Sequence, residues 1–436
     1  MDEPIRMTSA EKLGMIVLLI IGLGVRLWWL FNVNSQPVTD FNFYYERAKD
    51  IAANRGYAVD GVFTAYWPVG YPFFLSLFFR IFGPSVILAK ILNTALTLSC
   101  IGLTYWITWR LWKSSILGFL AGLILAIAPP FVAYSGIVAS EPLYTALTLL
   151  AIAWSLVAFQ KPRFWLLVGV AVGFATLVRP QAVLIPFLII PGVALFSRSE
   201  REDRRFNYKK AFAYSLAAML LIQFPWHIRN LVVFKKPVFI STNGGDNLWI
   251  GNNENATGKY IPPPGIPQSP AKELANDKAT RTEGKNYILD NPGKVISLWP
   301  AKLEATFLTR SDVAYWSFQT EKGKLITPGM GSDKPLYKFT QRFSANFAYW
   351  LLIFAGVGAV LSFPFLESRR ALGIPVAMIG LTALLSMVFF GNPRFGFPAI
   401  PFQAMLAASA VGSIFMLMSL PLAWWQEKKS PPGRLE

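Results

Sequence analysis

Cysteine and histidine are almost missing from this chain of 436 residues, which contains one of each, Cys100 and His227. A single cysteine excludes a disulfide within the chain, and the pair supplies too few ligands for a conventional zinc site. A metal site would have to use carboxylates, which favours Mg²⁺ or Mn²⁺. Charge is scarce as well. Charged residues make up 15% of the sequence, whereas about a quarter is typical of a soluble domain.

What the chain does contain is apolar residues, which are 54% of the total. They gather in runs of about 17–25 residues, the length that crosses a hydrocarbon layer of about 30 Å. The first run, Leu13–Phe31, is too long for the core of a signal peptide and is expected to be retained. The sequence therefore predicts an all-α polytopic membrane protein with about ten transmembrane helices. The predicted spans are 13–33, 86–109, 116–134, 142–159, 164–178, 182–197, 211–228, 346–366, 371–390 and 398–421.

Basic residues explain the formal net charge of +17 without nucleic acid as a partner. Many of them fall in alternate short loops, at 110–113, 161–163, 198–210, 369–370 and 428–429. The positive-inside rule makes these loops cytoplasmic, together with both termini. We therefore expect a multi-pass protein of the plasma (inner) membrane, with every unusual loop on the outer face.

The outer loops divide the chain into three predicted regions. Residues 1–228 form an N-terminal transmembrane region that includes a first outer loop, 34–85, in which Tyr71–Phe82 is a helix too short to span. Residues 229–345 form an outer domain, and residues 346–436 a C-terminal transmembrane region with a cytoplasmic tail. The outer domain is expected to be mixed α/β. Segment 238–253 has the pattern of strand, turn and strand, 271–289 that of a polar helix, and 295–307 that of an amphipathic helix on the lipid surface.

Asp40 is the most informative residue of the first outer loop, because it directly follows the first span. Either Thr39 or Asp40 could cap a helix over 41–54, which Gly56 would end. Alternatively, a carboxylate at the membrane edge could accept a proton in catalysis. The two interpretations are compatible, since a capping residue is held rigidly.

Glu141 begins a span directly before Pro142, where a carboxylate favours the positive end of a helix. A functional role is an equal alternative, because two carboxylates on one membrane face could share the work of a base and of metal binding. Glu46 is the other candidate for a second carboxylate.

Arginines at the outer ends of apolar segments are candidates for binding a lipid phosphate. Arg394 lies in a turn broken by Pro393, Gly396 and Pro398, and its guanidinium fork suits a phosphate. Arg229 ends the seventh span and could do the same, and Arg179 lies at the end of another. The alternative for such residues is snorkelling to the interface.

The run 243–253 is rich in Asn and Gly and contains Trp249. The amide of Asn247 and the ring of Trp249 would suit a sugar, whereas a tight hairpin held by asparagine turns is the alternative.

Taken in order, these residues resemble the GT-C superfamily of membrane glycosyltransferases. The closest likeness is to its branch of dolichyl-phosphate-mannose protein mannosyltransferases and aminoarabinose transferases, glycosyltransferase family 39. The likeness rests on Asp40 with Tyr44-Tyr45, on Pro68-Val-Gly-Tyr-Pro72, on Ser140-Glu141-Pro142, and on Pro225-Trp-His-Ile-Arg-Asn230 with the 241–253 run and the late Arg394 turn. One departure is that Phe41 follows Asp40, where many members have an adjacent Asp-Glu pair.

The resemblance implies that Asp40 is the catalytic base and leaves a second carboxylate role to Glu141 or Glu46. The candidate substrate-binding residues are Arg394, Arg229, Tyr44, Arg179, Trp249 and Asn247. The donor would be a polyprenyl-phosphate-linked sugar, and the acceptor a hydroxyl of a glycolipid, polysaccharide or protein of the cell envelope. Transfer would invert the anomeric centre, with no certain cofactor and a divalent cation as an option. The rival hypothesis is a transporter or flippase, which would place ionisable residues near the bilayer midplane.

Overall fold

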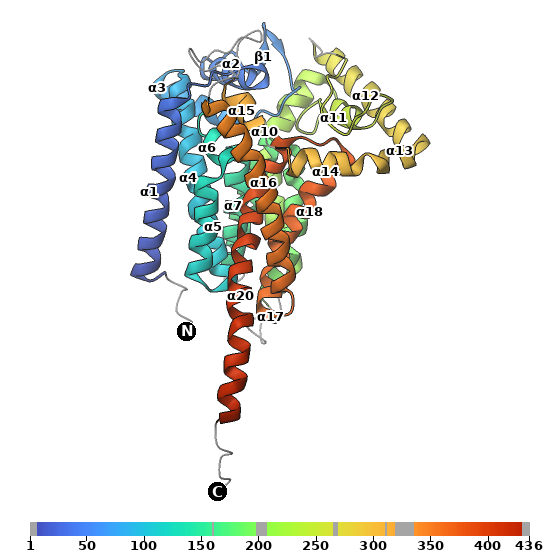
Figure 1. Cartoon of the computed structure of the whole chain (residues 1–436). Helices are drawn as coiled ribbons and strands as arrows, with labels where there is room; N and C mark the ends of the chain where they lie inside the picture. Colours follow the sequence, from blue (N-terminus) through green and yellow to red (C-terminus); the bar gives the residue numbers. More distant parts are fainter. Residues whose placement is uncertain are drawn as a thin grey trace.

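The computed structural model describes residues 7–158, 161–197, 207–264, 269–309, 312–318 and 335–429, with the side chains of 366, 367, 416 and 419–429 excluded. These residues form a bundle of long helices with a layer of shorter ones at one end (Figure 1). Helix α1 (Ser9–Asn32) starts at one end of the bundle and delivers the chain to the other. We call this second end, which holds segment 34–85 and helices α11–α14, the loop side. The helical fold class is confirmed.

Each of the ten predicted spans coincides with an apolar helix or a pair of helices. Within the described residues, seven helices are long and apolar enough to cross a membrane. The remaining three spans correspond to the shorter α5, α8 and the η1–α9 pair. The bundle contains α1, α4 (Val86–Trp112), α5 (Ser115–Ile127), α7 (Glu141–Ala158), α8 (Phe164–Val178), η1 (Pro180–Leu184), α9 (Ile185–Ser197), α10 (Tyr208–Phe234), α16 (Pro335–Ser362), α18 (Gly373–Val388) and α20 (Ile400–Lys429).

Prolines and a helix boundary modify three of the predicted spans. The predicted span 116–134 ends early, because Pro129 and Pro130 start a separate short helix, α6 (Pro129–Ala133). The span 371–390 is preceded by a short helix, α17 (Leu366–Ala371). Helix α16 begins at Pro335, eleven residues before the predicted span that starts at 346.

Helix α7 and the start of α20 lie in the centre of the bundle. In each, 78% of the most apolar 18-residue window is buried within the protein, against 22% for α1. A helix that is apolar on all sides belongs in such an interior position. Small residues permit the closest approaches. A Cβ on Gly358 of α16 would lie 1.8 Å from the carbonyl oxygen of Leu406 in α20. Helix α7, which starts at Glu141, and helix α20, which follows Arg394, are therefore the most enclosed helices of the bundle.

The loop side is built almost entirely from helices. The first loop holds α2 (Thr39–Ala52), a two-stranded antiparallel hairpin of β1 (Ala58–Val59) and β2 (Val62–Phe63), and α3 (Gly70–Phe82), the predicted helix too short to span. The later segment holds α11 (Gly244–Gly251), α12 (Pro270–Asp290), α13 (Pro292–Ser297), α14 (Trp299–Phe307) and α15 (Asp312–Ser317). The predicted polar helix over 271–289 is confirmed as α12. The single helix predicted over 295–307 is wrong, since Leu298 separates α13 from α14.

The strand, turn and strand predicted over 238–253 is wrong, because residues 244–251 are the helix α11. Asn252 and Asn253 donate from their side chains to the carbonyls of Leu248 and Trp249 and so end the helix instead of forming a hairpin turn. Gly245 allows α11 to lie on α12, since a Cβ there would be 2.2 Å from the carbonyl oxygen of Asp277. Packing on α12 thus overrides the local turn preference of asparagine and glycine.

Candidate active site

Four charged side chains from distant parts of the sequence meet at the loop side. Arg394 donates from Nη1 to Asp40 Oδ2 at 2.7 Å and from Nε to Glu141 Oε1 at 2.5 Å. Arg179 Nη2 lies 2.8 Å from the same Glu141 oxygen. We call Asp40, Glu141, Arg179 and Arg394 the charge cluster. Two positive and two negative groups balance, which is the condition for keeping charges away from water.

Asp40 lies in the first turn of α2 but does not cap that helix. The residue before the helix is Val38, which makes no side-chain capping bond, so the capping interpretation of Thr39 and Asp40 is wrong. The Asp40 carboxylate instead accepts from the Thr39 hydroxyl at 3.0 Å and from Arg394. Thr39 has a φ of +51°, which is unusual for a β-branched residue and costs about 1–3 kcal/mol. The backbone directly before Asp40 is therefore strained, a feature that clusters at functional sites.

Glu141 starts the central helix α7, as predicted, and its side chain is 0% exposed. Arg179 follows the end of α8 and turns back so that its guanidinium faces both Glu141 and the ring of Tyr144, which is 5.9 Å away. Two buried polar atoms of this pair, Glu141 Oε2 and Arg179 Nε, have no hydrogen-bond partner among the described residues. Such orphaned atoms are rare in a finished core and mark a place where a ligand or water belongs.

Arg394 is carried by the short helix α19 (Pro393–Gly396), whose first turn is capped by Asn392. The Asn392 side chain accepts from the backbone N–H of Arg394 at 2.9 Å. The residue before it, Gly391, donates its N–H to the Gly258 carbonyl at 2.8 Å. A Cβ on Gly391 would lie 2.2 Å from the carbonyl oxygen of Lys302, so only glycine fits. The turn that presents Arg394 is thus held by the helices of the loop side.

Lys302 of α14 is a second support of this turn that the sequence did not reveal. We expected it on a lipid-facing surface, but its side chain is 0% exposed. Its ammonium donates to the carbonyl of Met387, near the end of α18, at 3.0 Å and to Asn252 Oδ1 at 3.2 Å. Burial lowers the pKa of Lys302 to about 8. A lysine within an amphipathic pattern gives no sign of its burial, because long side chains commonly snorkel to water.

Aromatic residues line the cluster. The guanidinium of Arg394 lies 4.5 Å from the ring centre of Phe41, the residue that replaces an acid after Asp40. Tyr44, one turn after Asp40, is buried, and its burial and the charge of Asp40 raise the pKa of its hydroxyl. The Tyr134 hydroxyl donates to Asp312 at 3.4 Å, which ties α15 to this region. Neither Tyr134 nor Asp312 was singled out from the sequence.

Three of the predicted substrate-binding residues make no described contact with the charge cluster. Arg229 donates to the carbonyls of Thr64 and Tyr57, both at 2.9 Å, and its guanidinium packs on Trp226, so it supports the first loop. Asn247 and Trp249 lie within α11. Glu46, the alternative second carboxylate, pairs with Lys49 on the surface of α2 at 2.9 Å. Of the two candidates, Glu141 is therefore the one that shares Arg394 with Asp40.

The donor set of the charge cluster does not suit a divalent cation. No group of three His, Cys, Asp or Glu that could hold a metal lies together within the described part of the chain. The two carboxylates that do approach each other are already bridged by Arg394, with Arg179 beside them. A cation between them would face two guanidinium groups at short range, which is unfavourable at low dielectric.

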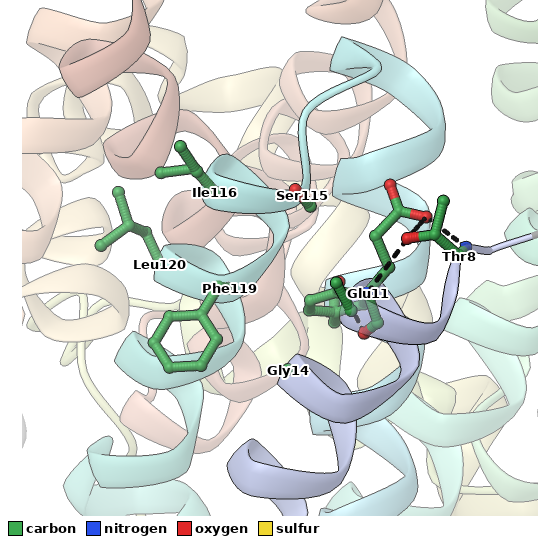
Figure 2. A pocket seen from close by; sticks show the side chains of 9 residues that line it. Thr8, Glu11, Gly14, Ser115, Ile116, Phe119 and Leu120 are labelled. Carbon is green, nitrogen blue, oxygen red and sulfur yellow. Dashed lines mark hydrogen bonds between the residues drawn. The ribbon is translucent and has the colours of Figure 1, made fainter.

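A groove at the opposite end of the bundle contains one acid, Glu11, and no residue of the charge cluster. It is lined by the starts of α1 and α5 and by Tyr105 of α4. Figure 2 shows Thr8 and Glu11 bonded to each other in a capping box, with Ile116, Phe119 and Leu120 on the other wall. The polar atoms here are used to start α1 and to hold Trp109, so the groove serves the fold.

Comparison with known proteins gives a match to one protein family. Residues 67–228 match the family model described as dolichyl-phosphate-mannose-protein mannosyltransferase. No curated protein sequence matches the chain.

Solved structures are similar over most of the chain. The archaeal oligosaccharyltransferase AglB from Archaeoglobus fulgidus, in complex with an inhibitory peptide and a dolichol-phosphate, aligns with 98% of the chain at 14% identity and a TM-score of 0.54. A second structure of the Archaeoglobus fulgidus oligosaccharyltransferase, tethered to an acceptor peptide, aligns with 96% at 15% identity and also 0.54. The alignments cover 53% and 51% of those chains, so this protein spans about half their length. ArnT from Cupriavidus metallidurans bound to undecaprenyl phosphate aligns with 96% of the chain and 81% of its own, at 15% identity and a TM-score of 0.42, too weak for inference.

The resemblance expected from the sequence is thus confirmed by the family match and by the fold. The chain is a multi-pass membrane protein with the fold of the GT-C glycosyltransferases, and its residues 67–228 carry the sequence pattern of the dolichyl-phosphate-mannose-protein mannosyltransferases.

Proposed function

We propose that this protein transfers a sugar from a polyprenyl-phosphate-linked donor to a hydroxyl acceptor, with inversion, at the membrane surface on which the loop side lies. The observation that carries the proposal is the bridging of Asp40 and Glu141 by Arg394 at the loop side. The family match supports sugar transfer, and the dolichol-phosphate in the AglB complex supports a polyprenyl phosphate as the lipid. A surface site suits a lipid-borne donor, whose sugar projects from the headgroup layer.

Asp40 is the base in this proposal. Its side chain is 17% exposed, more than any other acid of the cluster, so it can reach a substrate. Its carboxylate takes the proton of the acceptor hydroxyl as the hydroxyl oxygen forms a bond to the anomeric carbon. The bond from that carbon to the phosphate oxygen breaks at the same time, and the phosphate leaves with the electron pair. Attack opposite the leaving group inverts the anomeric configuration.

Arg394 stabilises the charge that develops on the leaving phosphate. Two of its three nitrogens hold the carboxylates, and the third, Nη2, has no hydrogen bond to a described residue. A phosphate that binds at Nη2 can also take over Nη1 from Asp40 as a bidentate partner. That exchange frees Asp40 Oδ2 to act as base, so donor binding and activation of the base are one event. An oriented guanidinium in a partly enclosed site is an effective stabiliser of such charge.

Glu141 acts through Arg394 and does not touch the substrate. It is fully buried, accepts a hydrogen bond from Arg394 and forms an ion pair with Arg179. Glu141 and Arg179 are therefore positioning residues in this proposal, and they keep the guanidinium of Arg394 beside Asp40 when the phosphate arrives. No step is routed through a metal, because the donor set does not suit one.

Purified protein in nanodiscs, given undecaprenyl-phosphate-linked sugars and hydroxyl acceptors, tests the proposal. We expect release of undecaprenyl phosphate coupled to formation of a glycoside, with the opposite anomeric configuration by NMR. The panel of acceptors should include a glycolipid, a polysaccharide fragment and a peptide, since each offers the hydroxyl that the reaction needs. Movement of the intact lipid-linked sugar across liposomes without any transfer would instead favour the flippase hypothesis.

A further inference from the structure

Tyr260 lies beside the turn that carries Arg394 and is held there by backbone pairing. Gly391 donates its N–H to the Gly258 carbonyl at 2.8 Å, and Lys259 forms a parallel bridge with Gly391. The ring of Tyr260 lies 5.8 Å from the ring of Phe390. Tyr260 follows Lys259 directly, so it is fixed against the turn that carries Arg394.

The ring of Tyr260 is open to solvent although its backbone is fixed, since the residue is 54% exposed. After burial, the charges of Asp40 and then Asp246 raise the pKa of its hydroxyl, which keeps the hydroxyl neutral. Asp246 is itself buried and accepts from Tyr66 at 2.6 Å and from Asn276 at 2.7 Å.

An aromatic ring in such a position has two common uses. It can anchor the protein in the headgroup layer, as interfacial tyrosines do, or it can receive the apolar face of a ligand ring while polar groups hold the ligand's edge. The second use is favoured here by the geometry. The phosphate of the proposed donor binds at Arg394, in the turn against which Tyr260 is held, so the sugar attached to that phosphate is brought to the same turn. A pyranose has the apolar face and the rim of hydroxyls that such a ring can receive.

We propose that Tyr260 is the platform on which a pyranose ring lies beside Asp40. This inference rests on the proposed function, since it supplies the sugar. The pyranose packs on the face of the Tyr260 ring, and its hydroxyls face the Asp40 carboxylate, the partly exposed acid of the charge cluster. The sugar is either that of the lipid donor or one belonging to the acceptor, and both present the same chemistry to Tyr260.

The experiment compares wild type with Tyr260→Ala and Tyr260→Phe, with Tyr287→Ala as control, a tyrosine of the same loop side on α12. In the donor arm, nanodisc binding is measured for undecaprenyl phosphate and for the same lipid carrying mannose, glucose or arabinose. In the acceptor arm, methyl glycosides of these sugars are titrated by saturation-transfer NMR in the presence of undecaprenyl phosphate.

If Tyr260 is a platform, Tyr260→Ala lowers the affinity for a sugar-bearing ligand about tenfold in one arm, which equals about 1.4 kcal/mol of binding free energy. It leaves the binding of sugar-free undecaprenyl phosphate unchanged. Tyr260→Phe keeps the ring and binds as wild type, and so does Tyr287→Ala. The arm that responds identifies the source of the sugar.

The platform is overturned if Tyr260→Ala has no effect in either arm, or if it weakens undecaprenyl phosphate as much as the sugar-bearing lipid. Absence of sugar-dependent binding to wild type in both arms also overturns it. A wild type that binds the sugar-bearing lipid more tightly through Tyr260 but never transfers the sugar would defeat the proposed function and leave the platform standing. The two proposals therefore fail by different results.

Discussion

Arg394 donates a hydrogen bond of 2.7 Å to Asp40 across a separation of 354 positions in the sequence. The bond joins the first turn of α2 to the turn before α20, so it closes the charge cluster from both ends of the chain. The sequence left open whether Asp40 caps a helix. In the structure its carboxylate is held by Arg394, and the residue at the cap position of α2 is Val38.

Asp40→Asn is expected to lower the rate of sugar transfer by about 10²–10⁴-fold, because the amide cannot accept the proton. The shape is kept and Asp40 caps no helix, so the melting temperature should change little. Single-turnover transfer with a lipid-linked sugar, beside a thermal melt in detergent, measures both. An Asn variant with near-normal turnover would remove Asp40 from the reaction.

Arg394→Lys is expected to weaken the binding of undecaprenyl phosphate, because lysine keeps the charge but loses the fork that reaches two oxygens. Lysine should also retain more of the fold than alanine, since removing one partner of a buried pair costs about 3–5 kcal/mol. Binding is measured in nanodiscs at several salt concentrations. Arg342→Lys, at an exposed position of α16, is the matched control. Equal affinity in Arg394→Lys and wild type would contradict a bidentate phosphate contact.

Glu141→Gln is expected to lower stability and donor binding together, because it leaves Arg179 and Arg394 facing each other with less negative charge nearby. The loss should be on the order of 3–5 kcal/mol, as for one broken partner of a buried pair. Glu46→Gln is the control, since Glu46 pairs with Lys49 at the surface, where such pairs contribute about 0–1 kcal/mol. Similar melting temperatures for the two variants would show that Glu141 does not organise the cluster.

Lys302 predicts a pH dependence of stability on the alkaline side. Its pKa falls from 10.5 to about 8 on folding, because burial disfavours the charged form. Between these two values the unfolded chain binds more protons than the folded one, so the free energy of unfolding should rise with pH. The gain is lost as the pH falls through about 8. Comparing the melting temperatures of wild type and Lys302→Met from pH 7 to 10.5 isolates the contribution of Lys302 to this pH dependence. A difference between the two proteins that does not change with pH would contradict it.

The orientation of the protein in the membrane can be tested by labelling single introduced cysteines. Cys100 is fully buried and should stay unreactive, so no background substitution is needed. If the loop side faces outward, an impermeant maleimide labels Lys285→Cys on α12 in intact cells. Lys161→Cys, in a basic loop after α7, should label only after permeabilisation. The reverse pattern would place the charge cluster on the cytoplasmic face.

The apolar runs were sufficient to predict the membrane-spanning helices. The ten apolar runs correspond to helices, seven of them long enough to cross a membrane within the described residues, because an unpaired backbone group is costly in hydrocarbon and a helix pairs its own backbone. The short helix at 70–82 and the polar helix at 270–290 could also be predicted, since prolines and glycines end both patterns. Asp40, Glu141 and Arg394 could be singled out because charge at the edge of an apolar segment is costly and therefore informative.

How these residues combine could not be predicted, because it depends on contacts between distant helices. Nothing in the local sequence states that Arg394 bridges Asp40 and Glu141, that Arg229 turns away to support the first loop, or that Lys302 is buried behind the Arg394 turn. The same holds for α11, where packing on α12 made a helix of a segment with hairpin chemistry. The physical reason is common to all of them. A charged or turn-forming residue can satisfy its hydrogen bonds in several ways, and the choice depends on partners that the chain brings within reach only when the bundle has formed.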